Sequence, residues 1–144
     1  MMTDVREAVA ADAAAIAQLL GQLDYPAMAD EVVARLDAIA ASPRHAVFVA
    51  LDEQGLHGLI AIERQLGLAF GERSEIVALV VDADRRRSGA GQRLVEAASA
   101  WARERGDDLL VVRSNVARSE SHPFYQGLGF ERTKTQHVYK LQLE

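Results

Sequence analysis

Apolar residues recur along the chain with two different periods, and the order in which these periods follow one another predicts a mixed α/β fold. Apolar side chains at helical spacing predict helices over residues 12–22, 29–40 and 90–105, and a fourth helix is expected to end near residue 128. Alternating or continuous apolar runs predict strands over residues 5–8, 46–51, 57–64, 75–81, 109–113, 130–132 and 138–143. We predict a single domain, residues 1–144, around one central β-α-β unit with a right-handed crossover.

Capping and turn residues mark where several of these elements begin and end. Asp12 is a suitable N-cap for the first helix. Pro43 is expected to end the second helix, because proline disfavours the helical conformation in the residue before it. Residues 52–55 have the length and the glycine of a hairpin loop, and another loop is expected around residues 67–71.

Composition excludes several classes of site. The 144 residues are 49% hydrophobic, enough for one core that buries roughly two-thirds of the unfolded surface. The chain has no cysteine, which excludes a thiol nucleophile, a disulfide and a thiolate zinc site. The four histidines are scattered, without the helical spacing of zinc hydrolases, so no metal is expected. No segment approaches the about 20 apolar residues of a membrane span, and no signal-peptide pattern is present, so we predict a cytoplasmic protein.

Formal charge divides unevenly between the two halves of the chain. Residues 1–72 carry 4 arginines against 11 acidic residues, a net charge of −7, whereas residues 73–144 carry a net charge of +2. An acidic first half could attract a cationic acceptor, although the solvated acidic face of a cytosolic protein would have the same composition. The balance disfavours a nucleic-acid partner.

A glycine-spaced, arginine-rich turn between residues 75–81 and the helix at 90–105 predicts an anion site. The first backbone N–H groups of a helix have no partner within the helix, and the helix dipole adds partial positive charge there. Gly89 and Gly91 would let the backbone approach a phosphate group closely, and Arg85, Arg86 and Arg87 would add charge. Taken alone, the same residues would also fit a helix start beside a solvated charge run.

The spacing Arg86-Arg87-Ser88-Gly89-Ala90-Gly91 resembles the pyrophosphate-binding signature of the GCN5-related N-acetyltransferase (GNAT) family. It does not fit a Walker A loop or the three-glycine dinucleotide fingerprint. The resemblance implies acetyl-CoA as the co-substrate and an α/β fold in which about four helices flank a central mixed sheet with splayed parallel strands. By the same resemblance, the cofactor would contact backbone or side chains of residues in the strand and the cradle: Leu79, Val80, Val81, Arg86, Arg87, Ser88, Gly89, Ala90, Gly91 and Gln92.

Two further motifs resemble the family and occur at the matching positions in the order of predicted elements. Asn115, with Ser114, follows the predicted strand at 109–113, where the family inserts the pantetheine arm of the cofactor. Asn115 could hydrogen-bond the cofactor or cap the next segment. Residues 122–130, HPFYQGLGF, resemble the family's helix-to-strand junction, in which a tyrosine lies near the CoA sulfur. The resemblance implies that Tyr125 contacts the cofactor and protonates the departing thiolate, although aromatic residues at such a position also serve core packing.

Acetyl transfer to an amine also calls for a base and for a group that stabilises the oxyanion. A primary amine is almost entirely protonated at pH 7, so a proton acceptor is wanted. Glu75 lies fourteen residues before Gly89, a spacing similar to that of the general-base glutamate in histone-acetylating members of the family, and Glu63 and Glu72 are substitutes. A solvent-exposed acid at a strand start is the alternative for Glu75. The resemblance further implies a bulge in the strand at 75–81 that frees the Leu79 N–H as an oxyanion donor.

These observations predict an enzyme that transfers the acetyl group of acetyl-CoA to a primary amine of a small, cationic acceptor by direct attack in a ternary complex. Asp24, Tyr25, Glu63 and Glu72 are the candidate acceptor contacts. One alternative is a CoA-binding sensor or interaction module with little turnover, and a weaker one is acetylation of charged tRNA, for which the chain lacks a basic surface. Residues 138–143 could pair with a second copy in a homodimer or close the sheet of a monomer.

Overall fold

The computed structural model describes residues 3–85, 88–114 and 121–143. The chain divides into two compact units: the first extends to Val112, and the second begins at Arg113. The two units are described separately, and the single domain expected from the sequence remains a prediction.

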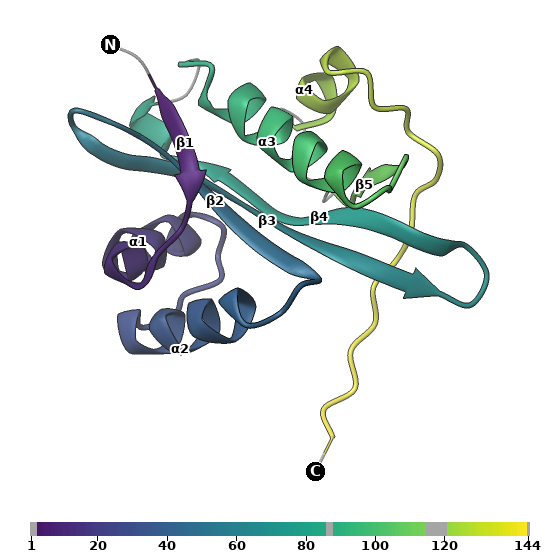
Figure 1. Cartoon of the computed structure of the whole chain (residues 1–144), viewed down its shortest axis with the longest axis horizontal. Helices are drawn as coiled ribbons and strands as arrows, with labels where there is room; N and C mark the ends of the chain where they lie inside the picture. Colours follow the sequence, from purple (N-terminus) through teal and green to yellow (C-terminus); the bar gives the residue numbers. More distant parts are fainter. Residues whose placement is uncertain (1–2, 86–87, 115–120, 144) are drawn as a thin grey trace. The chain divides into compact units, whose positions relative to one another are not determined.

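The first unit contains one sheet with strand order β1-β2-β3-β4-β5 (Figure 1). The strands are β1 (Asp4–Glu7), β2 (His45–Asp52), β3 (Gly55–Gly67), β4 (Gly71–Val81) and β5 (Leu110–Val112). Neighbouring strands are antiparallel except β4 and β5, which run parallel. All five were predicted, but β3 and β4 are longer than their apolar runs because their ladder continues through polar residues to the pair Gly67 and Gly71.

Three α-helices and two 3-10 turns connect these strands. The α-helices of this unit are α1 (Ala13–Gln22), α2 (Ala29–Ala40) and α3 (Ala90–Glu104), and the 3-10 turns are η1 (Ala10–Asp12) and η2 (Ala83–Arg85). Asp12 directly precedes α1 as predicted. Its carboxylate, however, makes no capping hydrogen bond to α1: it accepts the N–H of Val9, the residue before η1, at 2.8 Å and pairs with Arg6 at 2.8 Å.

The sheet separates α1 and α2 on one face from α3 on the other (Figure 1). Leu59 of β3 and Val80 of β4 belong to the buried cluster formed with α1 and α2. Gly58 faces the other way, because a Cβ atom built there would lie 3.1 Å from the Leu94 side chain of α3. Since successive strand residues alternate between faces, odd-numbered residues of β3 beyond Gly58 point toward the α1/α2 face and even-numbered residues toward the α3 face. The alternation is broken at His57, where the register with β2 shifts, and Leu56 before it packs against the α1/α2 cluster.

The second unit contains α4 (Ser121–Gly127), and Pro123 lies in its first turn as predicted. Gly129 follows the helix with a φ of 95°, and the Phe130 N–H donates to the Tyr125 carbonyl at 3.1 Å. This closure satisfies a carbonyl at the helix end.

The two strands predicted at residues 130–132 and 138–143 are wrong, because neither segment has a ladder partner in the described part of the chain. The alternation of apolar side chains that predicted residues 138–143 is present, and Tyr139 is 89% exposed. Apolar side chains that alternate with a period of two make a segment compatible with a sheet. Strand formation also requires a neighbouring strand whose backbone N–H and C=O groups are available for pairing.

Candidate active site

The predicted cradle begins where α3 begins. Gly89 is the N-cap of α3 with a left-handed φ of 84°, and its carbonyl accepts the Arg93 N–H at 3.1 Å. A Cβ atom built on Gly89 would have no neighbour within 4 Å among the described residues. Ala90 and Leu94 are 1% and 0% exposed, which fixes the first turn against the sheet.

These features fit an anionic group at the first turn of α3. The first N–H groups of an α-helix point along its axis without intrahelical acceptors, and they start here at Ala90, Gly91 and Gln92. The first turn contains no acidic residue. Ser88 is exposed beside it, and its Oγ accepts the Ala90 N–H at 3.4 Å. Arg86 and Arg87, also predicted to bind the cofactor, lie outside the described residues.

Arg85 does not supply free charge to this cradle, contrary to the expectation from the run of three arginines. Its guanidinium makes an ion pair with Asp52 of β2 and donates to the Gln54 side chain at 2.9 Å. The positive charge is thus neutralised by a carboxylate of the β2–β3 hairpin. Nothing in the spacing of the two residues along the sequence predicts this pair, because it is formed by tertiary packing.

A β-bulge in β4 determines which way the Leu79 backbone faces. Ile62 pairs with Ile76, and Ala61 with Ala78, so Val77 is the extra residue. On the far side of the bulge, the Asp82 N–H donates to the His57 carbonyl of β3 at 2.8 Å. Because N–H groups alternate along a strand, Val81 and Leu79 face away from β3.

Without the bulge, the Leu79 N–H would face β3. The Ser74 N–H donates to the Leu109 carbonyl at 3.2 Å, so Ser74 faces the β5 side, and strict alternation from Ser74 would turn Leu79 toward β3. The extra residue Val77 reverses the side of β4 to which each later N–H group points. The parallel pairing of β4 with β5 ends at Ile76 and Val112, so Leu79 faces an edge to which the described residues contribute no strand.

A row of polar side chains crosses the α1/α2 face beside this bulge. Glu75 of β4 lies directly opposite Glu63 of β3, which lies opposite His45 of β2. The His45 Nε2 atom is 3.5 Å from a Glu63 carboxylate oxygen, and the Gln65 side chain donates to Glu63 at 3.2 Å. Glu75 is 5% exposed, so it is not the solvent-exposed strand-start acid that the sequence left open.

Glu72, a substitute for Glu75 in the sequence prediction, lies on the other face. It pairs with Arg44 at 2.7 Å and lies 3.6 Å from Arg64. The hydrogen bond from Arg44 holds the pKa of Glu72 below its usual value, and burial opposes this effect. The structure therefore brings Glu63 and Glu75 together and separates Glu72 from them.

Asp107 completes an ionic cluster on the α3 face. Its carboxylate accepts two hydrogen bonds from Arg64, both at 2.9 Å, and one from the Ser74 hydroxyl at 2.8 Å. Hydrogen bonds from Arg64 hold the pKa of Asp107 below its usual value, against the opposing effect of burial. This cluster ties the end of α3 to β3 and β4.

The remaining predicted site residues belong to other segments than the cradle and the polar row. Asp24, with a φ of 63°, and Tyr25, 69% exposed, lie in the turn after α1. Tyr125 belongs to α4 of the second unit, where its ring meets Phe124 and Phe130 edge-on at centroid distances of 5.3 and 5.6 Å. Asn115 lies outside the described residues.

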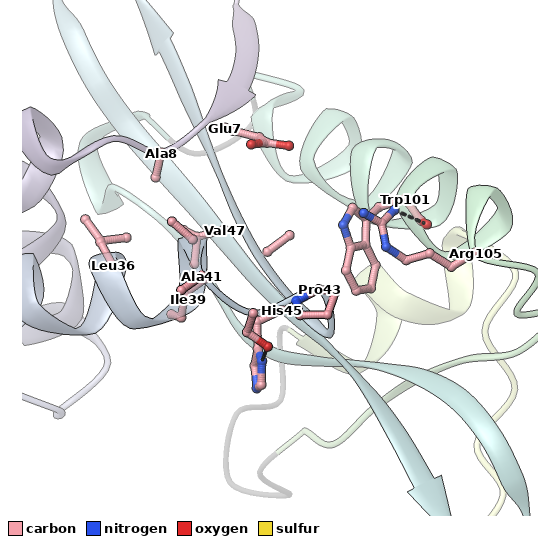
Figure 2. Close-up of a pocket in the computed structure, with 13 residues that line it drawn as sticks. Glu7, Ala8, Leu36, Ile39, Ala41, Pro43, His45, Val47, Trp101 and Arg105 are labelled. Atoms are coloured by element: carbon pink, nitrogen blue, oxygen red, sulfur yellow. Dashed lines mark hydrogen bonds between the residues drawn. The ribbon is translucent and has the colours of Figure 1, made fainter.

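A cleft of about 410 Å³ lies at the start of β2 (Figure 2). Leu36 and Ile39 of α2 line one side, and Trp101 and Arg105 line the other. The Arg105 guanidinium lies 4.0 Å from the Trp101 ring centroid and donates to the Trp101 carbonyl at 3.0 Å. Since β3 separates β2 from β4, this cleft is distinct from the bulge and cradle.

Sequence reasoning missed His45, Asp52 and Asp107 as parts of these polar clusters. His45 was one of four scattered histidines, and only the strand register brings it to Glu63. Among residues 3–85, 88–114 and 121–143, no group of three or more histidine or acidic side chains is placed to hold a metal ion. No helix within those ranges has the length and apolar character that crossing a bilayer requires.

Comparison with known proteins identifies relatives for most of the chain. The family model described as "Acetyltransferase (GNAT) domain" matches residues 43–132. An aminoglycoside N(6')-acetyltransferase type 1 from Stenotrophomonas maltophilia is 30% identical over 97% of this chain and 94% of its own length. A second aminoglycoside N(6')-acetyltransferase type 1, from Serratia marcescens, is 29% identical over 76% of this chain and 79% of its own length.

A solved structure shares the fold at lower sequence identity. The aminoglycoside N-acetyltransferase AAC(6')-Iy in complex with CoA superposes with a TM-score of 0.87 and 19% identity, covering 99% of this chain and 96% of that chain. At this level of identity the match concerns the fold.

Proposed function

The chain belongs to the GNAT family of acetyl-CoA-dependent N-acetyltransferases, and from this premise we propose that it acetylates a primary amine of a small, polycationic acceptor by direct attack in a ternary complex. The observation that carries the proposal is the position of the buried Glu75. It precedes the bulge at Val77, which turns the Leu79 N–H toward the edge of β4 that no strand of the described residues covers.

The start of α3 would hold the pyrophosphate of CoA. Backbone N–H groups of Ala90, Gly91 and Gln92 are the donors, and Gly89 leaves room for the phosphate oxygens. Ser88, Arg86 and Arg87 belong to the same proposed cradle. When bound, acetyl-CoA supplies an activated acyl group as a thioester.

The outward edge of β4 would bind the pantetheine arm. Val81 would pair with the arm through its backbone as an added strand does, with Val80 packed below in the core. Asn115 is proposed to contact the same arm. Leu79 would donate its N–H to the acetyl oxygen as negative charge develops there, a contribution of several kcal/mol when the donor is preorganised.

Glu75 is proposed as the general base. Its carboxylate, directly or through water, would accept a proton from the acceptor ammonium and so generate the neutral amine. Glu63 lies directly opposite and would hold the positive charge of the acceptor near Glu75. Tyr125 is proposed to donate its hydroxyl proton to the departing thiolate and to contact the cofactor.

An aminoglycoside-like polyamine is the acceptor class that we propose. Two relatives at 30% and 29% identity are named aminoglycoside N(6')-acetyltransferases. The carboxylates of Glu63 and Glu75 suit an ammonium group, and the net charge of −7 in the first half would steer a polycation toward the site. Asp24 and Tyr25 are further proposed contacts.

The cradle is tested by substituting Gly89 with glutamate, which adds a negative charge and a Cβ atom at a φ of 84°. Acetyl-CoA at about 100 times its dissociation constant should stabilise the wild type by about 2.7 kcal/mol, or roughly 5 to 11 °C. We expect Gly89→Glu to lose this thermal shift.

Gly106→Glu is the matched control, because Gly106 has the same φ of 84° at the opposite end of α3. It should keep the shift with acetyl-CoA. ATP and NAD, tested in parallel, should stabilise neither protein. A wild type that is not stabilised by acetyl-CoA or CoA would overturn the proposed cradle, and CoA binding without acetylation of any amine in a broad panel would favour a CoA sensor.

A further inference from the structure

We propose that Asp52 is a positioning residue for the cofactor cradle, acting through Arg85. In this proposal the Asp52–Arg85 ion pair clamps the segment that leads into α3 onto the β2–β3 hairpin, and Arg85 is not itself a phosphate ligand. The inference rests on the proposed use of residues 88–92 to bind CoA.

The pair has the geometry of a two-pronged clamp. Both terminal nitrogens of Arg85 reach the Asp52 carboxylate, and the Nη1 atom also donates to the Gln54 side chain at 2.9 Å. The Asp52 side chain is 2% exposed and the Arg85 side chain 23%. Charge-assisted, two-pronged pairing shielded from water fixes orientation as well as distance.

Asp52 is itself held in place. It is the last residue of β2, where it pairs with Gly55 of β3, and its carboxylate accepts the Gln54 N–H at 2.8 Å. The Nδ1 atom of His57, a side chain 2% exposed, lies 3.9 Å from a carboxylate oxygen of Asp52. The clamp thus extends from the end of the β2–β3 ladder.

The segment before the cradle is attached to the same region at further points. The Asp82 N–H donates to the His57 carbonyl at 2.8 Å, and the Ala83 N–H donates to the Gln22 side chain of α1 at 3.0 Å. The Arg85 N–H closes η2 by donating to the Asp82 carbonyl at 2.9 Å. Arg85 is the last described residue before Ser88.

The short length of chain between Arg85 and Ser88 links the position of the ion pair to that of the cradle. Ser88 follows Arg85 by three residues, and a fully extended chain spans at most about 3.6 Å per residue, so the two Cα atoms lie within about 11 Å of each other. On the other side, Ala90 is 1% exposed and anchored with α3. Fixing Arg85 therefore restricts the positions that Ser88 and Gly89 can adopt.

The clamp and a phosphate-ligand role for Arg85 predict opposite effects of removing the Asp52 charge. If Arg85 bound phosphate, Asp52→Asn would remove a competing anion, free the guanidinium and tighten CoA binding. If Arg85 is a clamp, the same substitution releases the approach to α3 and weakens CoA binding. The sign of the change in the dissociation constant distinguishes the two.

The experiment measures the dissociation constant of CoA by calorimetry for the wild type, Asp52→Asn, Arg85→Gln and the double variant, well below the unfolding midpoint of each. We expect each single substitution to weaken binding about tenfold, which corresponds to about 1.4 kcal/mol. The double variant should be no weaker than the single variants, because either change opens the same clamp. Arg85→Lys should recover only part of the affinity, since lysine cannot form the two-pronged pair.

Charge-matched controls are Asp37→Asn and Arg35→Gln, both exposed positions on α2, which should leave CoA binding unchanged. Steady-state kinetics distinguish a positioning role from a general loss of folded enzyme. Asp52→Asn should raise the KM for acetyl-CoA while leaving kcat at saturating acetyl-CoA near the wild-type value. CoA binding that is tighter or unchanged in Asp52→Asn would overturn the clamp. A wild type that binds no CoA would instead overturn the proposed function, so the two failures are distinguishable.

Discussion

Acidic side chains of β3 and β4, and of the turn after α3, have different neighbours on the two faces of the sheet. On the α3 face, Asp107 is paired with Arg64, and Glu72 with Arg44. On the α1/α2 face, Glu63 has a histidine and an amide as neighbours and lies directly opposite Glu75. The contrast distinguishes Asp107 and Glu72, which are paired with arginine, from Glu63 and Glu75, the carboxylates that we propose take part in acetyl transfer.

Pairing with arginine affects the protonation of the two carboxylates on the α3 face. Arginine donates to a carboxylate and stabilises its charged form, and the pKa values of Asp107 and Glu72 are lowered in this way. A carboxylate held charged by arginine is a weak proton acceptor, whereas a general base works best with a pKa near the working pH. Sequence alone ranks Glu72 beside Glu63 and Glu75, and the two faces separate them.

The largest effect is expected from Glu75→Gln, which removes the proposed base and keeps its shape. Turnover should fall by about 100-fold or more, since general acid–base catalysis contributes about 10²- to 10⁴-fold. Steady-state kinetics with a polyamine acceptor measures the loss, and calorimetry should show CoA affinity unchanged. Turnover equal to that of the wild type would remove Glu75 from the mechanism.

Asp107→Asn should lower stability and leave turnover nearly unchanged, the reverse of what Glu75→Gln is expected to do. It leaves Arg64 in a site built for a carboxylate, so the free energy of unfolding at pH 7 should fall by about 2 to 4 kcal/mol. Denaturant unfolding measures the loss. The kcat of the folded variant should stay near the wild-type value, and a large fall in kcat without a fall in stability would contradict the division between the faces.

The same variant should change the pH dependence of stability. Asp107 has a folded-state pKa below its usual value of 3.8, so its contribution is fully present above that value and is lost as the pH falls through the lower folded-state pKa. Unfolding measured from pH 6 downward should show a flatter decline below about pH 4 in Asp107→Asn than in the wild type. Parallel curves would mean that Asp107 does not carry this part of the acid sensitivity.

A smaller effect is expected from Tyr125→Phe in the second unit. The phenylalanine ring can keep the edge-on contacts with Phe124 and Phe130 while losing the hydroxyl. If the hydroxyl protonates the thiolate, kcat should fall by about tenfold or more with CoA affinity retained. A variant that loses stability but keeps kcat would assign Tyr125 to packing.

The smallest effect is expected from Glu72→Gln. This residue pairs with Arg44 and Arg64 on the face opposite Glu75, and ion pairs of exposed residues contribute little. Turnover should stay within about twofold of the wild type in the same assay as Glu75→Gln. A loss comparable to that of Glu75→Gln would show that the α3 face takes part in acceptor chemistry.

Much of the fold could be predicted because it depends on local patterns. The helical spacing of Leu94, Ala98 and Trp101 predicts α3, and all three are buried. Gly89 marks the helix start because few other residues adopt its φ of 84°. The strands predicted at 130–132 and 138–143 failed because pairing depends on a neighbouring strand, which local alternation does not specify.

The sequence by itself determined the family, the order of elements through β5 and the glycine turn at the start of α3, because each follows from residue types at short, regular spacing. Only the tertiary structure decided that Glu63 lies opposite Glu75, that Glu72 lies on the other face, and that Asp52 holds Arg85. A bulge in β4 was expected from the family resemblance, and the tertiary structure decided that Val77 is its extra residue. These outcomes depend on strand register and long-range packing, where a shift of one residue reverses the side of the strand on which every later group lies.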